Sequence, residues 1–395
     1  MTYDFDTVIS RKNTSSLKWN VKENELPMWV ADMDFQTAPE IIRALKARTE
    51  HGIFGYSEVE DDWYKAYISW WSRRHGLKIE KNWLVFCTGV IPAISSSVRK
   101  LTTPNENVVI QTPVYNIFFN SIINNGCRPL ENALIYENGE YRMDFEDLEM
   151  KLSDPQTTLM LLCNPQNPTG KIWDFKTLKT VGDLCAKYNV TVISDEIHCD
   201  LVAPGKEYIP FASVSENCKN NSITCIAPTK AFNIAGLNTA AVCIPNKELR
   251  HKIWRALNTD EVAEPNAFAV GAAVAAFTEG EAWLNELNAY IKANKDYVES
   301  FISENIPEIG VIKGDATYLV WLDIHKLSNY LPNVSNLSGY VVSFIRKETG
   351  LWLCPGIEYG LAGESFLRLN AACPRSVLND GLNRLMTAVA KIKEK

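Results

Sequence analysis

The stretch Ile223-Thr-Cys-Ile-Ala-Pro-Thr-Lys-Ala-Phe-Asn-Ile-Ala-Gly236 decides the fold class that this chain should adopt. Its first five residues form an apolar run with the length of a buried strand, and Lys230 lies in the loop that follows. A lysine between an apolar strand and an apolar, glycine-containing loop is poorly solvated, which lowers its pKa and makes the amine nucleophilic. Most lysines face solvent, so this segment by itself is also compatible with an ordinary surface lysine.

Similar apolar runs recur on both sides of this one and alternate with helical segments. They lie at residues 83–87, 108–111, 159–163, 190–194, 223–227 and 240–244. Continuous apolar strands separated by helices are what a mainly parallel sheet requires when both of its faces are buried. We therefore predict an α/β fold whose large central domain has a sheet sandwiched between helices.

The flanking parts of the chain carry further signals. Thr37-Ala-Pro-Glu40 has the pattern of a capping box and predicts a helix that runs toward Gly52. Two more helix-like stretches and one strand candidate lie at 58–75, 280–304 and 317–322. We expect a large domain over 49–285 and a smaller α/β domain built from both ends of the chain, 1–48 and 286–395.

Composition bounds the kinds of protein that this chain can be. It has 395 residues, of which 46% are hydrophobic, and a formal net charge of −7, which provides no uniform basic field for nucleic acid or anionic membranes. No apolar stretch approaches the ~20 residues of a membrane span, and none resembles a secretion signal, so we expect a cytoplasmic protein without nucleic-acid or membrane partners. The ten cysteines form no CxxC pair and the five histidines are isolated, which predicts reduced thiols and no metal site.

Polar residues follow several of the predicted strands, at the edge of the sheet where open α/β folds bind ligands. Thr88-Gly-Val-Ile-Pro92 follows the first strand, and the free N–H groups of a helix that starts there would bind a phosphate. Asn164-Pro-Gln-Asn-Pro-Thr-Gly170 leaves an amide side chain free, and Asp195-Glu-Ile-His198 supplies a carboxylate and an imidazole. Each segment alone is also typical of an ordinary turn, a helix cap or a half-buried histidine.

Together these segments are hard to explain as coincidence, because a phosphate cradle, an amide, a carboxylate and a lysine follow successive strands in one order. The set resembles the fold-type I enzymes that use pyridoxal 5′-phosphate (PLP), the aspartate aminotransferase superfamily, over nearly the whole chain. Within it the chain is most similar to the carbon–sulfur β-lyases of the MalY/PatB (cystathionine β-lyase) type. The segments that carry the closer resemblance are 28–35, 89–94, 195–198, 230–236 and 366–374. The resemblance implies a mainly parallel sheet of the seven-stranded type.

The resemblance also implies roles for residues around the cofactor ring. Lys230 would hold PLP through an imine and later remove the proton from the substrate's α carbon. Asp195 would pair with the pyridine nitrogen and keep it protonated. Asn167 and His198 would hydrogen-bond the phenolic oxygen, and Tyr115 would stack on the ring, although a tyrosine after a strand is also typical of the core.

Other implied roles concern the phosphate and the substrate. The phosphate site would contain Gly89, Val90, Ile91 and Thr229, with Tyr56 reaching it from the neighbouring subunit of a homodimer. Arg368 would bind the α-carboxylate through two parallel hydrogen bonds, although an arginine there could also form a surface ion pair. Asn238 is a departure, since relatives often have a basic residue at this position. Backbone N–H groups would then meet most of the phosphate charge.

The resemblance implies a PLP-dependent carbon–sulfur lyase. Its reaction would be α,β-elimination from L-cystathionine, L-cysteine or S-substituted cysteines, which yields a thiol or sulfide, pyruvate and ammonia. Neither spacing nor composition separates this reaction from transamination, so an amino-acid aminotransferase remains an alternative. A regulatory protein with a PLP fold and little catalysis is a third.

Overall fold

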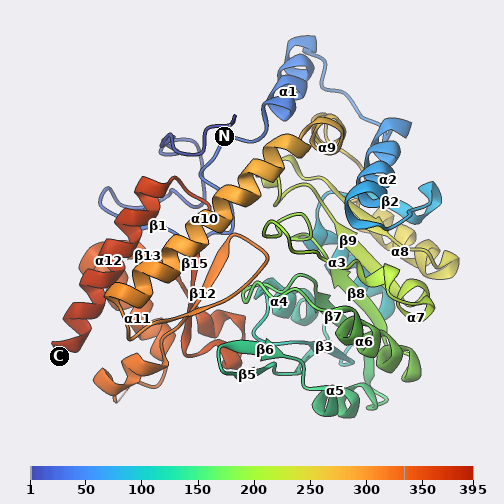
Figure 1. Cartoon of the computed structure of the whole chain (residues 1–395). Coiled ribbons are helices and arrows are strands. Elements are labelled where there is room, and N and C mark those ends of the chain that lie inside the picture. Colours follow the sequence, from blue (N-terminus) through green and yellow to red (C-terminus); the bar gives the residue numbers. More distant parts are fainter. Residues whose placement is uncertain (1, 333, 395) are drawn as a thin grey trace.

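The computed structural model describes residues 2–332 and 334–394, so the two end positions of the predicted domains, 1 and 395, lie outside the described residues. Its largest sheet has seven strands in the order β2–β10–β9–β8–β7–β3–β4 (Figure 1). All neighbours are parallel except β10, which runs antiparallel to β2 and β9. The strands are β2 (Leu84–Cys87), β3 (Asn107–Ile110), β4 (Arg128–Glu131), β7 (Thr157–Cys163), β8 (Thr191–Asp195), β9 (Ser222–Ile226) and β10 (Ala240–Cys243).

The six strands predicted from apolar runs are confirmed, and so is the mainly parallel sheet of seven strands. The sequence missed only β4 in this sheet, which has the composition Arg-Pro-Leu-Glu. β4 is an edge strand whose first residue is exposed, so it needs no continuous apolar run.

Helices cover both faces of this sheet, which explains why its central strands are apolar throughout. On one face, α3 (Val90–Leu101), α4 (Ile117–Ile123) and α8 (Lys247–Thr259) bury their apolar sides. On the other face, α5 (Phe145–Leu152), α6 (Phe175–Lys187) and α7 (Glu216–Asn220) cover the strands around β7, while α2 (Asp61–His75) and α9 (Ala269–Glu279) cover those around β10. Alternate strand residues point to opposite cores: Leu161 belongs to the first and Leu162 to the second.

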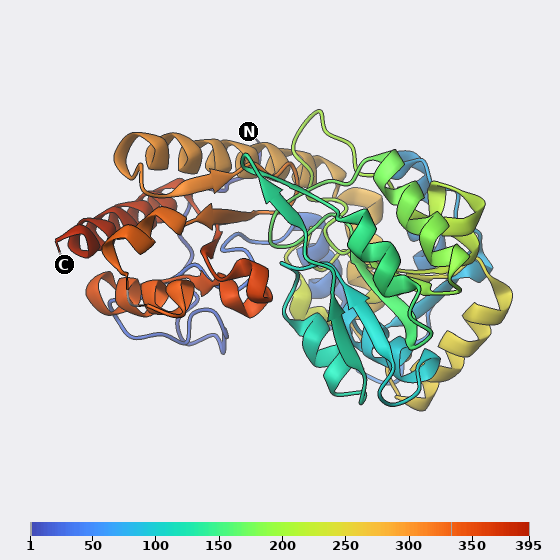
Figure 2. The ribbon, with the colours of Figure 1, turned by 90° about the horizontal axis from the view of Figure 1, so that it is seen from below.

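A second, antiparallel sheet has the order β11–β12–β15–β14, and it lies beside the larger one (Figure 2). Its strands are β11 (Gly310–Ile312), β12 (Leu319–Asp323), β14 (Cys354–Pro355) and β15 (Phe366–Asn370). Its apolar core includes residues of α10 (Glu281–Asn305), α11 (Leu337–Thr349) and α12 (Arg375–Lys393). The N-terminal segment joins this part, because β1 (Leu26–Pro27) pairs in parallel with β13 (Leu351–Trp352).

The predicted domain boundaries fall within helices. Position 48/49 lies in α1 (Pro39–His51), and 285/286 lies near the start of α10. The first half of α10 packs in the core of the larger part through Leu284 and Leu287, and its second half packs in the smaller core through Val298 and Ile302. In Figure 1 this long helix, drawn in gold, connects the two parts.

The predicted helices are confirmed, with α1, α2 and α10 close to their expected ranges, and β12 is the strand expected at 317–322. The capping box was wrong. The helix N-cap is Ala38, with Pro39 at the first helical position, and the Thr37 hydroxyl donates to the Phe232 oxygen at 2.6 Å instead. Thr37 therefore fastens the start of α1 to the loop that contains Lys230.

The remaining elements are small. β5 (Ile135–Glu137) and β6 (Glu140–Arg142) form a separate hairpin. Short 3₁₀ helices lie at Lys81–Trp83, Phe211–Ser213, Ala235–Leu237, His325–Tyr330, Gly356–Tyr359 and Leu361–Gly363. In residues 2–332 and 334–394, none of the helices combines the length and the apolar character that crossing a membrane requires.

Candidate active site

A cavity of about 520 Å³ lies where several strands of the large sheet end. Successive βα turns bring their residues together there, because the carboxyl ends of parallel strands share one edge of the sheet. The cavity lining contains most of the residues singled out in the sequence, namely Gly89, Val90, Ile91, Tyr115, Asn167, Asp195, His198, Thr229 and Lys230.

Lys230 is the cation in the lining of this cavity. Its Nζ donates a hydrogen bond to the Ala31 oxygen at 2.6 Å. Burial lowers the pKa of Lys230 to about 8, assisted by the positive charge of Arg368 and opposed by the carboxylates of Asp32 and Asp195. An amine with such a pKa is partly unprotonated near neutral pH, so it can act as a nucleophile and as a base.

Asp195 and His198 are buried beside this lysine. Burial raises the pKa of Asp195 to about 7, opposed by the Ile197 N–H, which lies 3.1 Å from Oδ1, and by the charge of Lys230. Burial and the charges of Lys230 and Arg368 lower the pKa of His198 to about 3, so its imidazole is neutral. His198 Nδ1 is buried and has no hydrogen-bond partner among the described residues. A buried ring nitrogen without a partner, beside a carboxylate with a raised pKa, is typical of a ligand site.

The loop after β7 places Asn167. Its backbone N–H contacts Cys163 Sγ at 3.3 Å, and its Oδ1 lies 3.4 Å from Arg368 Nη1. The loop is fixed at Gly170, which has a φ of +71° and packs against the backbone that leads into β12. A Cβ at Gly170 would lie only 2.8 Å from the Ala316 oxygen, so no other residue fits without movement.

The start of α3 forms the other end of the cavity. Gly89 is the N-cap, and the N–H groups of Val90 and Ile91 belong to the first turn, where a helix offers no internal acceptors. Thr229 lies in the same lining. These donors, together with the helix dipole, favour an anion at this end.

Arg368 lies on β15 of the second sheet, beside the cavity rather than in its lining, and is only 5% exposed. Its Nη2 donates to the Trp29 oxygen at 2.7 Å, and its guanidinium carbon lies 5.0 Å from the centre of the Tyr359 ring. Among the described residues, Nε has no hydrogen-bond partner. The buried cation is held by neutral groups, so it is not the surface ion pair considered as an alternative, and it remains available to a carboxylate.

Tyr56 is the one predicted site residue that the described chain does not bring to the others. Its side chain is fully exposed, and it lines a different groove on the outside of α1 and α9, next to Arg48 and Phe268. The expected contact of Tyr56 with a phosphate therefore stays a prediction.

The structure adds residues that sequence reasoning did not assign to the site. Ala31 lines the cavity, and the Tyr318 hydroxyl donates to the Ala31 oxygen at 2.9 Å. Asn238, which the resemblance already associated with the phosphate site, also lies in the lining. Ala31 belongs to the 28–35 segment that carries the resemblance, and this was the signal that could have pointed to it. The role of its backbone oxygen cannot be predicted from the residue type, because every residue has one.

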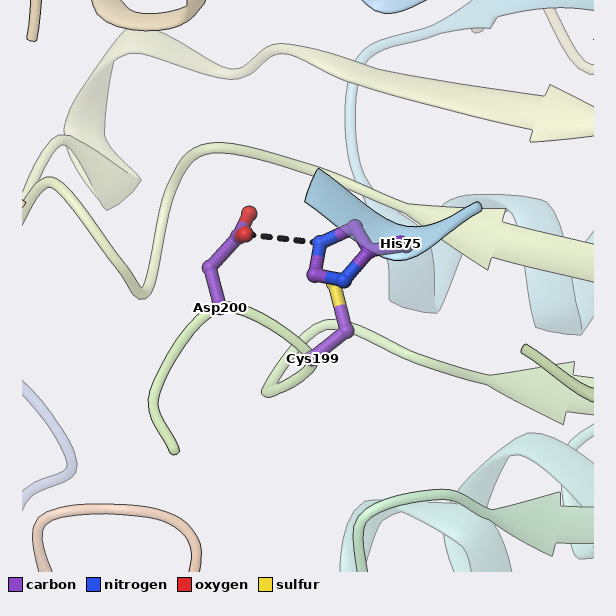
Figure 3. A group of neighbouring side chains, drawn as sticks. All are labelled: His75, Cys199 and Asp200. Carbon is purple, nitrogen blue, oxygen red and sulfur yellow. Dashed lines mark hydrogen bonds and ion pairs between the residues drawn. The ribbon is translucent and has the colours of Figure 1, made fainter. Parts of the chain in front are cut away.

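A second polar cluster consists of His75, Cys199 and Asp200 (Figure 3). Cys199 and Asp200 directly follow His198 in the chain. The Asp200 carboxylate contacts Trp70 Nε1 at 3.0 and 3.1 Å and His75 Nε2 at 2.8 Å, and Arg74 Nε lies 3.3 Å away. These donors already occupy the carboxylate that a metal ion would need. The cluster fastens the end of α2 to the turn that carries His198.

Comparison with known proteins identifies the relatives of this chain. The sequence matches the family "Aminotransferase class I and II" over residues 24–385. It is 43% identical to cystathionine beta-lyase PatB of Bacillus subtilis, covering 98% of this chain and all of that protein. It is 35% identical to protein MalY of Escherichia coli over 99% of this chain and all of MalY.

A solved structure gives the same result. Cystalysin from Treponema denticola, which contains a pyridoxal 5′-phosphate cofactor, superposes with a TM-score of 0.94 at 33% identity, covering 100% of both chains. The resemblance found in the sequence is confirmed, as is the fold class. This chain belongs to the aminotransferase class I and II family.

Proposed function

We propose that this protein is a PLP-dependent carbon–sulfur β-lyase. Its substrates are L-cystathionine, L-cysteine and related S-substituted cysteines, and with one water each yields a thiol or sulfide, pyruvate and ammonia. The observation that carries the proposal is the meeting of the Lys230 amine, the Asp195 carboxylate and the N-terminus of α3 in one cavity. The kinship with cystathionine beta-lyase PatB supports the choice of elimination.

The residues fit PLP on their own chemistry. A buried carboxylate such as Asp195 is stabilised by a protonated pyridine nitrogen. The neutral imidazole of His198 can hydrogen-bond the phenolic oxygen of PLP through its unpaired Nδ1. The Lys230 amine suits an aldehyde, and the free N–H groups of Val90 and Ile91 suit a phosphate. Tyr115 supplies an aromatic wall.

Each of the chain's own groups would then have a separate role in the reaction. When bound, PLP supplies the electron sink that stabilises negative charge on the substrate's α carbon. Arg368 binds the α-carboxylate and fixes the orientation of the substrate. Lys230 Nζ takes the α proton, and Asp195 holds a proton on the ring nitrogen. His198 stays neutral and adds no charge that would compete with Asp195.

The test of this function is product analysis without a keto acid. We expect equal amounts of thiol and pyruvate from L-cystathionine, measured with a thiol reagent and with lactate dehydrogenase. Turnover that requires an added α-keto acid and releases no thiol would contradict the lyase and favour an aminotransferase, the alternative that the family name suggests.

We also propose a homodimer with shared sites, in which Tyr56 of one protomer completes the phosphate site of the other. The loop between α1 and α2 supports this, since Ile53, Phe54 and Tyr56 are all exposed on it. Exposed apolar side chains in one place are typical of a protein–protein contact. The domain limits at 48/49 and 285/286 and the cytoplasmic location stay predictions.

Mixing two inactive variants tests the shared site. Lys230→Ala and Tyr56→Ala chains, denatured and refolded together, should regain activity, because a mixed dimer has one site that lacks both changes. At equal amounts, roughly a quarter of all sites would be intact. Refolding each variant alone is the control. A mixture that stays as inactive as its parents, although mass spectrometry detects mixed dimers, would contradict the sharing of Tyr56.

A further inference from the structure

The segment Trp29–Met33 crosses the active site, and side chains from both parts of the molecule hold its backbone oxygens. Arg368 binds the Trp29 oxygen at 2.7 Å, and Lys230 and Tyr318 bind the Ala31 oxygen. Asn370 donates to the oxygens of Val30 and Asp32, at 2.7 and 2.6 Å. Asn233 donates to the Met33 oxygen and accepts from its N–H, both at 3.0 Å.

A cluster of four charged residues anchors the same segment. Arg11 binds both oxygens of Asp32, at 2.9 and 2.7 Å, together with the Met33 oxygen and Asp34. Lys18, only 1% exposed, binds Asp34 at 2.7 Å and lies 3.7 Å from Asp32. Trp19 Nε1 donates to Asp34 at 2.8 Å. Two cations thus neutralise two carboxylates, and the N-terminal residues hold the segment in place.

We infer that Asp32, held by Arg11 and Lys18, is a positioning residue that fixes the Ala31 oxygen against Lys230 Nζ and sets the charge around that nitrogen. The inference rests on the proposed function, because Lys230 acts on the cofactor there. Asp32 does not touch the cavity itself; it acts through the residue before it in the chain and through its field.

The charges that face Lys230 identify Asp32 as the partner to test. Asp195 after β8 and Asp32 on the N-terminal segment raise the lysine pKa, while Arg368 on β15 and burial lower it. The other titratable groups nearby are neutral: His198, Tyr318, Tyr115 and Cys163. Asp34 shares Arg11 and Lys18 with Asp32 but is not among the groups that shift Lys230, so it is a matched control.

The experiment is a pH titration of the visible absorption of the holoenzyme. Asp32→Asn should move the midpoint to lower pH by on the order of half a unit or more, since it removes a negative charge near the lysine nitrogen. Arg11→Gln should move it to higher pH, because Asp32 then loses its main counter-charge. Asp34→Asn should destabilise the protein as much as Asp32→Asn while shifting the midpoint less.

The two variants should shift the midpoint in opposite directions, which distinguishes a positioning role from a merely structural one. A structural role would lower the melting temperature of both variants without shifting their midpoints in opposite directions. The inference is wrong if Asp32→Asn titrates like the wild type, if it shifts no more than Asp34→Asn, or if Arg11→Gln moves the midpoint down. If Asp32→Asn does not fold, the sign of the Arg11→Gln shift still decides. A wild-type protein that takes up PLP without visible absorption would instead contradict the proposed function.

Discussion

Replacing Lys230 with alanine is expected to lower kcat/KM for β-elimination by about 10⁴-fold, the upper range for loss of a positioned acid–base group. In the proposed function the lysine supplies both the amine for the cofactor and the base for the α proton, and no other cation lines the described cavity. The visible absorption of the holoenzyme should change as well, because the covalent attachment is lost. Steady-state pyruvate formation and absorption spectra measure the two effects.

Lys295 provides a control for the burial of a lysine as such. Like Lys230 it is partly buried, and burial lowers its pKa to about 8. Its Nζ donates to the backbone oxygens of Gly314 and Ala316, at 2.5 and 3.1 Å, outside the cavity. Lys295→Ala should therefore lower the melting temperature but leave the cofactor absorption unchanged. If Lys230→Ala retains wild-type turnover, the assignment of the base is wrong.

Replacing Asp195 with asparagine is expected to have opposite effects on activity and on stability. Elimination should fall by about 10²- to 10³-fold, because the amide cannot hold a proton on the ring nitrogen. The cofactor-free protein, in contrast, should become more stable at pH 8. The introduced amide would keep an oxygen for the Ile197 N–H without a buried charge, so Asp195→Asn removes the cost of ionising a carboxylate there.

The Asp195→Asn variant should be the more stable at pH 8 because the pKa of Asp195 is raised in the folded protein. Asp195 has a folded pKa of about 7 and an unfolded value of about 3.9, so it contributes stability below pH 4 that is lost as the pH rises to 7. The wild type at pH 8 should thus be less stable than the variant by a few kcal/mol, and the two should converge at pH 4. Chemical denaturation of both cofactor-free proteins at these pH values measures the difference. A wild type that is the more stable at pH 8 would contradict it.

Local sequence was sufficient for much of the fold. The six apolar runs became strands because a strand covered on both faces has no polar positions, and this leaves a continuous pattern. The edge strand β4 needs no such pattern and was missed. The capping box failed because Thr37 found a distant acceptor, the Phe232 oxygen, and Pro39 already suited the first turn.

Most of the candidate site could be predicted for a related reason. Gly89, Asn167, Asp195 and Lys230 each lie at or just after the end of a strand, so the topology of the sheet brings them to one edge. Tyr56 could not be placed, because its predicted partner belongs to another chain. The Ala31 oxygen was missed because backbone groups are the same at every residue.

The sequence by itself determined which strands are buried, which turns carry polar groups, and to which family the chain belongs, since these properties depend on residues close together in the chain. Only the tertiary structure decided the charge environment of Lys230. Asp32, Asp195 and Arg368, which shift the pKa of Lys230, come from three distant segments, and Arg11 from a fourth pairs with Asp32. A field depends on distance in space and on burial rather than on order in the chain.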